Sequence, residues 1–405
     1  MLTLKMAFRN IFRQKRRTVF TGLSVVAGFA LAAIFIGWAD GSYNNIIDQF
    51  TRNRLGHIQI HEKTYLDRPS LYKTVDDVAA IGDLLDRTDG VEAWAPRVYA
   101  PGLAAAGEKS AGVQIIGLDP AREEAATNFE RKLLEGRTFS GGRAAEVVLG
   151  RGLAEVLQSG IGDEVVIISQ AADGSIANDS YELVGIAATG DDLSDRVSFF
   201  LPLDTAQELL VLDGRVHEIA VIVHKLGRVD EIARLVSAKI SDPDLAVETW
   251  QVFARSFYQA MKADKAGMWA LLVVIVVIVA VGVLNTVLMS VLERRREYGL
   301  LKAVGTKPRL IIRLVLLEVV ILSVLSMAVG AGLGLGANVL LAKHGIKFSE
   351  GLTWGGMVFD TMKSEVNLRS FIIPAVTVVI CAVLVSLIPA LKAARTEPAK
   401  TMRLH

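Results

Sequence analysis

The side chains that could bind a metal ion or catalyse a reaction are few in this sequence, and their spacing suits neither role. His57 and His61 flank Gln59 in an alternating run that predicts a β-strand. Because ligands four residues apart on a strand lie too far from each other to share one zinc ion unaided, we expect two solvated histidines. The acidic pair Asp191 and Asp192 falls in a polar, turn-like stretch that we interpret as a solvated loop. The sequence therefore predicts no catalytic residue and no metal site.

Glycine motifs that bind nucleotides are also missing from the sequence. The pattern G-x-x-x-x-G-K-[ST] does not occur, and the segment from Gly107 to Ser110 lacks the required upstream glycine spacing. A second glycine series lies inside a long apolar stretch, where small residues four apart favour close packing between helices. Its members are Gly330, Gly332, Gly334 and Gly336. We therefore expect no cofactor in this chain.

The composition indicates a protein that is partly in a membrane and partly in water. Hydrophobic residues make up 52% of the 405 residues and charged residues 21%, which is too high a charged share for a chain buried wholly in lipid. The net charge of +1 gives no support for nucleic-acid binding. The only cysteine, Cys381, excludes an intrachain disulfide.

Four apolar stretches are each long enough to cross a bilayer, which takes about 20 residues of helix. They are residues 18–39, 266–292, 308–342 and 370–392. The first exceeds the apolar core of a signal peptide, so we expect an uncleaved anchor. The third carries Arg313 and Glu318 near its start, and we expect both side chains to snorkel to the membrane interface or to contact a partner. In the second, Asn285 and Thr286 favour a hydrogen bond between helices, and a contact with another subunit or with a substrate between the spans is the alternative.

Residues 40–263, between the first two stretches, have the composition of a folded α+β domain. Strand and helix patterns alternate in two pieces near residues 56–120 and 215–252, and a β-rich insert separates the pieces. Residues 1–17 form a basic amphipathic helix. The predicted fold class is therefore a membrane protein with four transmembrane helices and a large extracytoplasmic α+β domain between helices 1 and 2.

The distribution of Lys and Arg predicts how the chain crosses the membrane. Residues 1–17, 293–307 and 393–405 are basic, so the positive-inside rule assigns these segments to the cytoplasm. With four spans, the domain of residues 40–263 and the loop of residues 343–369 then lie on the outer side. Both termini are expected in the cytoplasm.

The charged segment between the second and third stretches resembles a known element. Residues 292–305 read LERRREYGLLKAVG, which is similar to the coupling segment of the FtsX/MacB/LolC-LolE permeases of ABC transporters. The basic start of the chain and the tail after Pro389 resemble the same family. The resemblance implies that this segment docks onto a cytoplasmic ATPase. The residues that it assigns to coupling are Glu293, Arg294, Arg295, Arg296, Glu297, Tyr298, Gly299, Lys302, Ala303 and Gly305.

By this resemblance the chain is the membrane subunit of a type VII, or mechanotransmission, ABC transporter of an inner membrane. It would pair with a second permease, identical or homologous, and with two copies of an ATPase that hold ATP and Mg²⁺. The chain has no ATPase before its first span, and its outer domain is larger than in the cell-division type. We therefore expect the LolC/LolE branch, whose substrate is a membrane lipoprotein passed to a periplasmic carrier. Adaptor-dependent drug or peptide efflux, and signalling to periplasmic enzymes, stay open as alternatives.

Within the lipoprotein interpretation, the acyl chains of the substrate would lie between the first and second spans of two subunits. The apolar residues there are Val25, Phe29, Ile34, Phe35, Val273, Val276, Val277 and Val281.

Overall fold

The computed structural model describes residues 6–10, 15–140, 145–354 and 357–397, so parts of the predicted basic head and tail lie outside the described residues. The chain divides into two compact units, which we call the helical unit and the sheet unit. The helical unit comprises Met1–Tyr43, Met261–Phe348 and Thr361–His405, and the sheet unit comprises Asn44–Ala260 and Ser349–Asp360.

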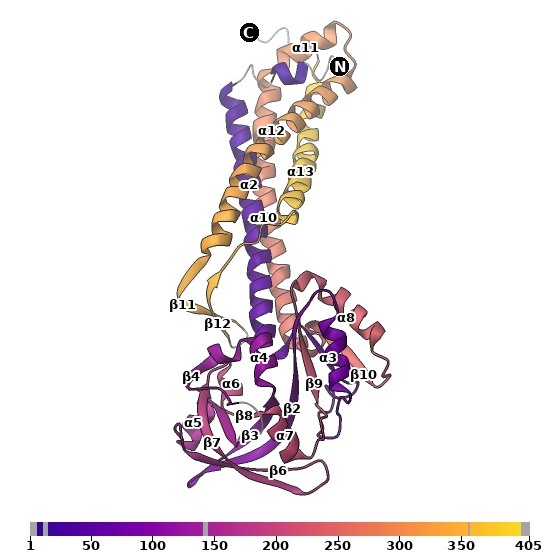
Figure 1. Cartoon of the computed structure of the whole chain (residues 1–405). Helices are drawn as coiled ribbons and strands as arrows, with labels where there is room; N and C mark the ends of the chain where they lie inside the picture. Colours follow the sequence, from indigo (N-terminus) through magenta and orange to yellow (C-terminus); the bar gives the residue numbers. More distant parts are fainter. Residues whose placement is uncertain (1–5, 11–14, 141–144, 355–356, 398–405) are drawn as a thin grey trace. The chain divides into compact units, whose positions relative to one another are not determined.

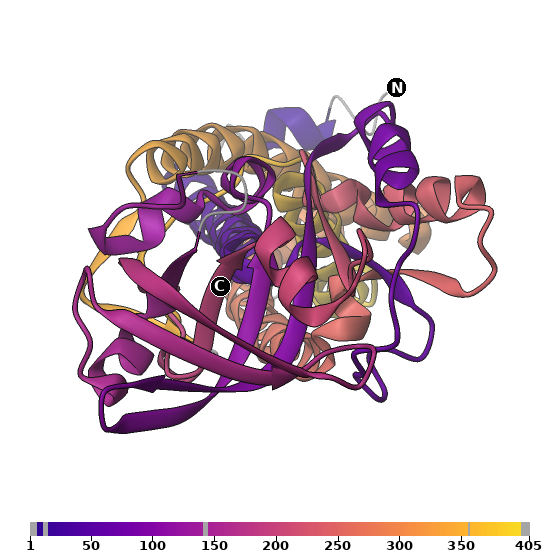
Figure 2. The ribbon, with the colours of Figure 1, turned by 60° about the horizontal axis from the view of Figure 1, so that its bottom comes forward.

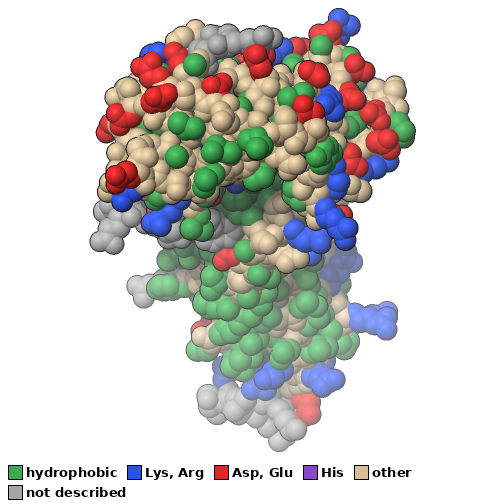
Figure 3. Space-filling view, turned by 90° about the horizontal axis from the view of Figure 1, so that it is seen from below, with side chains coloured by type: hydrophobic (Ala, Val, Ile, Leu, Met, Phe, Trp, Pro, Cys, Tyr) green, Lys and Arg blue, Asp and Glu red, His purple; other side chains and the backbone are tan. Residues whose placement is uncertain are grey.

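Four long helices build the helical unit (Figure 1). They are α2 (Lys15–Phe50), α10 (Arg255–Glu293), α12 (Pro308–His344) and α13 (Arg369–Ala394). Each is long and apolar enough to cross a membrane, and each contains one of the four predicted stretches. Hydrophobic side chains cover these helices, and Lys and Arg side chains gather at the end of the helices that is lowest in the view (Figure 3). The four predicted spans are confirmed, and α2 and α10 continue well past the predicted boundaries at residues 39 and 266.

Small residues let α2 and α12 pack closely. A Cβ atom added to Gly330 would lie 3.0 Å from a backbone carbonyl oxygen of α2, and one added to Gly334 would lie 3.1 Å from the Cβ of Ala33. Gly332 and Gly336 face open space instead. The predicted close packing is therefore confirmed for Gly330 and Gly334, because only these two glycines lie on the face of α12 that meets α2.

Two short connections link the helices: the first lies in the helical unit, and the second, a hairpin, belongs mostly to the sheet unit. The helix α11 (Arg295–Ala303) joins α10 to α12, and a hairpin of β11 (Ile346–Trp354) and β12 (Met357–Met362) occupies the predicted loop of residues 343–369. After the hairpin, Ser364 Oγ donates to Asn338 Oδ1 (3.0 Å), and Asn338 Nδ2 donates to the carbonyl oxygen of Ala33 (3.1 Å). A buried amide in α12 is thus satisfied from two neighbouring segments.

The sheet unit is built on one ten-stranded sheet, whose strands are seen in Figure 2. Its first part consists of β1 (Ile58–Glu62), α3 (Val78–Asp86), β2 (Val91–Ala106), β9 (Glu218–Val223), α8 (Val229–Lys239) and β10 (Leu245–Thr249). Here the strand order is β10-β1-β9-β2, and all three pairs are antiparallel. This is a double split β-α-β arrangement. The two predicted strand–helix–strand pieces therefore interleave in one sheet rather than standing side by side.

The β-rich insert between β2 and β9 extends the same sheet. The order continues β2-β3-β8-β5-β7-β4, and β6 pairs with both β2 and β7. The strands are β3 (Lys109–Leu118), β4 (Leu133–Gly136), β5 (Glu146–Gly150), β6 (Glu164–Gln170), β7 (Ile176–Ala187) and β8 (Ser198–Pro202). The helices are α4 (Pro120–Thr127), the short 3₁₀ helix η2 (Phe129–Lys132), α5 (Arg151–Leu157), α6 (Asp192–Asp195) and α7 (Leu203–Leu210). Buried Phe129, Phe139 and Phe200 pack in its core.

The prediction that His57 and His61 are solvated is wrong, since both are buried. The reason is that β1 lies between β9 and β10 inside the sheet. His57 Nδ1 accepts a hydrogen bond from the backbone N–H of Val223 (3.0 Å), so its proton is on Nε2, which lies 3.2 Å from Asp48 Oδ1. Within the described residues, no group of three His, Cys, Asp or Glu side chains could hold a metal ion.

The predicted solvated loop at Asp191 and Asp192 is confirmed in part: Asp192 is exposed, but it begins the short helix α6, and Asp191 directly precedes that helix. Asp191 is its N-cap, and its Oδ1 accepts hydrogen bonds from the backbone N–H groups of Leu193 and Ser194. An acidic side chain at this position is stabilised by the start of the helix, so the pair needs no catalytic explanation.

Candidate functional site

The charged segment between α10 and α12 folds as a helical hairpin whose tip is α11. α10 ends at Glu293, and Arg294 leaves the helical region before α11 begins. After α11, Gly305 has a φ of +95°, a conformation that favours glycine. Pro308 then stands at the first position of α12, where its missing N–H costs no hydrogen bond. The sequence thus fixes both ends of the tip.

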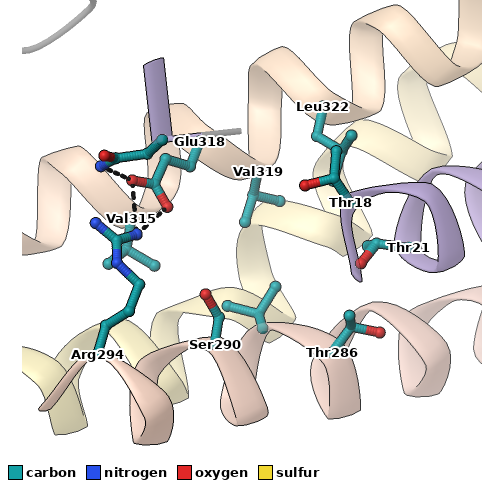
Figure 4. Close-up of a pocket in the computed structure, with 11 residues that line it drawn as sticks. Thr18, Thr21, Thr286, Ser290, Arg294, Val315, Glu318, Val319 and Leu322 are labelled. Atoms are coloured by element: carbon teal, nitrogen blue, oxygen red, sulfur yellow. Dashed lines mark hydrogen bonds and ion pairs between the residues drawn. The ribbon is translucent and has the colours of Figure 1, made fainter. Parts of the chain in front are cut away.

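An ion pair anchors this tip to α12 (Figure 4). Arg294 Nη1 lies 3.1 and 3.0 Å from the two carboxylate oxygens of Glu318, and Arg294 Nε donates to Glu297 (2.8 Å). Asn10 Nδ2 donates to the same Glu318 carboxylate (2.6 Å). The side chains of Arg294 and Glu318 are only 11% and 15% exposed. Such a pair is strong because both charges are partly removed from water and their hydrogen bonds are satisfied.

The sequence-based interpretation of Glu318 is therefore wrong. We expected its side chain to snorkel or to contact a partner, whereas it pairs with Arg294 within the chain. The reason is that a carboxylate on a membrane helix needs a cation or several donors, and the hairpin brings Arg294 to it across 24 residues of sequence. Arg313, by contrast, has an exposed side chain.

Two further contacts lock α11 to the helical unit. Tyr298 is fully buried and belongs to a hydrophobic cluster that includes Ile311 of α12 and Ala393 of α13. Lys302 Nζ donates to the carbonyl oxygens of Ala394 (3.1 Å) and Thr396 (2.9 Å). A cation there satisfies carbonyls at the C-terminal end of α13, which have no partner within their own helix.

The opposite face of α11 is open. Leu300 is 60% exposed and Val304 is 82% exposed, and the side chains of Arg295 and Arg296 are exposed beside them. Among the ten residues that the resemblance assigned to coupling, the structure exposes Glu293, Arg295, Arg296, Ala303 and Gly305, and buries Tyr298 and Gly299. Leu300 and Val304 were missed, although their spacing of four on a helix was a readable signal. The exposed surface at α11 therefore consists of the apolar side chains of Leu300 and Val304 with the basic side chains of Arg295 and Arg296 beside them.

A small polar cavity lies beside the ion pair, between α2, α10 and α12 (Figure 4). Its volume of about 50 Å³ leaves room for a few water molecules, and its lining includes Thr18, Thr21 and Ser290. Thr286 also lines it, and its hydroxyl donates to the carbonyl oxygen of Gly282 in its own helix (2.7 Å). The predicted hydrogen bond between helices is therefore wrong for Thr286. Asn285, one residue earlier, has an exposed side chain.

The eight residues proposed to face a substrate do not share one surface. Val25 and Phe29 are 1% and 2% exposed, because they pack inside the helical unit, so these two positions do not line an open face. Ile34, Phe35 and Val276 are partly buried. The exposed members all lie on α10 and are Val273, Val277 and Val281.

Aromatic side chains join α2 to α10 near the ends that lie far from α11 in sequence. Within the helical unit, Tyr43 donates a hydrogen bond to Asp264. Within the sheet unit, the rings of Phe50 and Phe257 stack with their centroids 3.7 Å apart. Beside this stack lies a groove of about 700 Å³, whose lining includes Phe253. Side-chain contacts therefore join α2 and α10 in the helical unit and again in the sheet unit.

Comparisons with known proteins agree on two adjacent regions of this chain. Residues 18–239 match the model of the MacB-like periplasmic core domain, and residues 269–398 match the model of the FtsX-like permease C-terminal domain. The lipoprotein-releasing system transmembrane protein LolC of Neisseria meningitidis serogroup B is 24% identical over 332 residues, which cover 78% of each chain.

Two exporters are similar at the same level. The macrolide export ATP-binding/permease protein MacB 2 of Aeromonas hydrophila is 23% identical over 98% of this chain and 60% of its own length. The pyoverdine export ATP-binding/permease protein PvdT of Pseudomonas fluorescens is 24% identical over 98% of this chain and 58% of its own length. This chain therefore spans less than two thirds of either exporter. From the domains matched and the four apolar helices, the chain belongs to the family of ABC transporter permeases that join a MacB-like periplasmic core domain to an FtsX-like permease domain.

Proposed function

We propose that this chain is the membrane subunit of an ABC transporter that extracts lipoproteins from the inner membrane and passes them to a periplasmic carrier. The packing of α11 supports the proposal that movement is transmitted through this helix. One face of α11 is packed against the helical unit, and the other exposes Leu300 and Val304. A helix held in this way moves its neighbours when a partner displaces it, because packed cores are not continuously deformable.

The partner of the open face is a cytoplasmic ABC ATPase, present in two copies, which holds the ATP and Mg²⁺. Protein–protein interfaces commonly have an apolar centre with a polar rim, and Leu300 and Val304 would form such a centre. The exposed Arg295 and Arg296 beside that pair favour the cytoplasmic side for this end of the helices, and hence for both termini. The permease itself carries out no chemical step.

ATP binding closes the two ATPases in this mechanism and displaces the α11 helices that rest on them. The Arg294–Glu318 pair passes the displacement to α10 and α12. α2 and α10 are unbroken helices of 36 and 39 residues, so they carry the displacement toward the sheet unit. No pore through the protein is required.

Three features favour a lipid-anchored cargo. The relative LolC is named as part of a lipoprotein-releasing system, and this chain and that relative each cover 78% of the other. The groove of about 700 Å³ beside Phe50, Phe253 and Phe257 has the apolar lining and the size that suit an acyl chain. Val273, Val277 and Val281 give α10 an apolar exposed face as well.

The test is reconstitution of the chain with its partner ATPase in lipid vesicles that carry a triacylated lipoprotein. We expect release of the lipoprotein to a soluble carrier that requires ATP hydrolysis. ATP hydrolysis without any release would overturn the proposal. The named exporters among the relatives, which match 98% of this chain, favour efflux as the second candidate. In that case a macrolide or pyoverdine, rather than a lipoprotein, stimulates the ATPase.

A second permease completes the transporter, and Asn285 supports its position. Asn285 is exposed on α10 in line with exposed Ile278, Val281 and Met289, at spacings of three and four residues. Within the described residues no hydrogen bond of its amide is seen, and an amide in lipid needs a partner. Since an amide both donates and accepts, two copies of Asn285 satisfy each other across a twofold axis.

Asn285→Cys should therefore form a disulfide between two copies of the chain under mild oxidation. The background is Cys381→Ser, which removes the only native cysteine. The readout is a band of twice the monomer mass on a non-reducing gel. Val329→Cys on α12, an exposed apolar position on another helix, is the control. Equal cross-linking from both positions would contradict an interface at Asn285.

A further inference from the structure

The end of α2 inside the sheet unit has an unusual form. The helix widens into one turn of π-helix, η1 (Thr51–Leu55), and stops at Gly56, which has a φ of +82°. The backbone N–H of Gly56 donates to the carbonyl oxygen of Thr51 (2.7 Å). A helix end leaves its last carbonyls without partners in the helix, and single π-turns occur frequently at functional sites.

Three side chains from elsewhere donate to three of the four other carbonyl oxygens of the π-turn. Lys132 Nζ donates to the carbonyl oxygen of Asn53, and Arg97 Nη1 donates to that of Arg54. Gln59 Nε2 donates to the carbonyl oxygen of Leu55 (2.8 Å). Two of the three donors are cations, which the negative end of a helix favours. An ordinary helix end needs only a glycine and backbone hydrogen bonds, so this one is held far more firmly than termination requires.

Arg97 is itself fixed in the middle of the sheet. It lies on β2 where that strand faces both Glu218 of β9 and Leu118 of β3. Its guanidinium donates to both carboxylate oxygens of Glu123 (3.0 and 2.9 Å), and its Nη1 lies 3.2 Å from Glu218. All three side chains are nearly inaccessible to solvent. A buried cation with this many bonds cannot move without the strands that carry it.

The charges around the π-turn are consistent with this geometry. Burial lowers the pKa of Lys132 to about 8, with Glu123 opposing the shift, so Lys132 is still mostly protonated at neutral pH. Burial acts to raise the pKa of Glu123, but the charge and hydrogen bonds of Arg97 outweigh it and lower that pKa. Burial raises the pKa of Glu218, and the charge of Arg97, 3.2 Å away, only partly offsets this shift. Arg97 and Glu123 therefore form the principal ion pair.

Side chains of the π-turn also reach outward to other parts of the sheet unit. Asn53 Nδ2 donates to the carbonyl oxygen of Thr189, and Arg54 Nη1 donates to Ser194 Oγ of α6 (2.7 Å). Arg52 forms a two-pronged pair with Glu92 of β2 (2.8 and 3.0 Å). The turn is therefore bonded to β2, to α6 and to the segment that precedes α6.

We infer that the π-turn is the joint through which α2 moves the sheet unit, and that Arg97 and Lys132 are the positioning residues that make this joint stiff. The inference rests on the proposed function, in which α2 transmits displacement. A stiff joint moves β2 and the Thr189–Ser194 segment together with the helix end. A loose joint lets α2 turn while the sheet unit stays where it is.

The test uses the full transporter in lipid nanodiscs, with spin labels at Gln49→Cys on α2 and Asp179→Cys on β7 in the Cys381→Ser background. Both labelled positions are exposed. In the unaltered joint we expect one narrow distance distribution that is the same with and without ATP. In Lys132→Met we expect a broader distribution that shifts with ATP, and cargo release lowered by about tenfold or more. Basal ATP hydrolysis should stay within about twofold of the parent value, because the ATPase surface is untouched.

Lys225→Met, at an exposed position in the same unit, is the matched control and should behave like the parent. Lys132 is chosen over Arg97 because loss of Arg97 would remove the ion-pair partner of both buried Glu123 and buried Glu218. Identical distance distributions in the parent and in Lys132→Met would contradict the inference that Lys132 stiffens the π-turn. If the parent releases no lipoprotein, the proposed function fails, but the distance measurement still decides whether the joint is stiff.

Discussion

Leu300→Asp should abolish binding of the partner ATPase while leaving insertion of the chain in the membrane intact. Leu300 is 60% exposed on the open face of α11, next to Val304 at 82%. If this face docks on the ATPase, the two side chains become the buried centre of the interface, where truncation of an anchor costs about 2–4 kcal/mol. Aspartate adds the cost of burying an unpaired charge. The measurement is the dissociation constant of the detergent-solubilised chain with the purified ATPase.

Ile176→Asp is the matched control for this experiment. Ile176 is 80% exposed in the sheet unit, so the same change of chemistry is made far along the chain from α11. We expect it to bind the ATPase like the parent protein. Wild-type affinity of Leu300→Asp would mean that the ATPase docks elsewhere, and the assignment of α11 as the coupling helix would have to be withdrawn.

Much of this architecture could be predicted from local pattern alone. The four apolar stretches and the basic tip between α10 and α12 depend on the composition of continuous segments, so they are readable without tertiary structure. The strands and helices of residues 40–263 are likewise local. Their interleaving is not, because the order β10-β1-β9-β2 brings together strands separated by more than a hundred residues. The alternation of apolar and polar residues along a strand does not show which other strands it pairs with.

The errors at polar residues have the same origin. His57 and His61 were expected in water because their spacing does not suit a shared zinc ion, but they lie directly before β1 and within it, an inner strand, and both rings are buried. Glu318 was assigned to the interface because its partner Arg294 lies outside α12, between α10 and α11, where no helical spacing rule applies. The coupling residues that a motif names include Tyr298, which proves to be an internal anchor, and omit Leu300, which is outside. A motif identifies a segment, whereas burial decides what each of its side chains does.

Reversing the charge of Glu318 should separate ATP hydrolysis from cargo release. Glu318→Arg places two cations face to face beside the small polar cavity, and Arg294 loses the carboxylate that it contacts at 3.0 and 3.1 Å. Removing one partner of a largely buried pair costs about 3–5 kcal/mol. We expect α11 to detach from α12, so that ATP is still hydrolysed but cargo release falls to background. The measurement is the ratio of lipoprotein released to ATP hydrolysed in reconstituted vesicles.

The double variant Arg294→Glu with Glu318→Arg tests whether the two residues act together as an ion pair or affect cargo release independently. If the pair is the anchor, the exchanged charges attract again and a substantial part of the release activity returns, so the two single effects are strongly non-additive. Recovery should be incomplete, because Asn10 donates to the Glu318 carboxylate and Glu297 accepts from Arg294, and neither contact survives the exchange. Arg313→Glu, an exposed charge reversal on the same helix α12, should have little effect. Additive losses in the double variant would argue that force reaches α12 by another route, such as the burial of Tyr298.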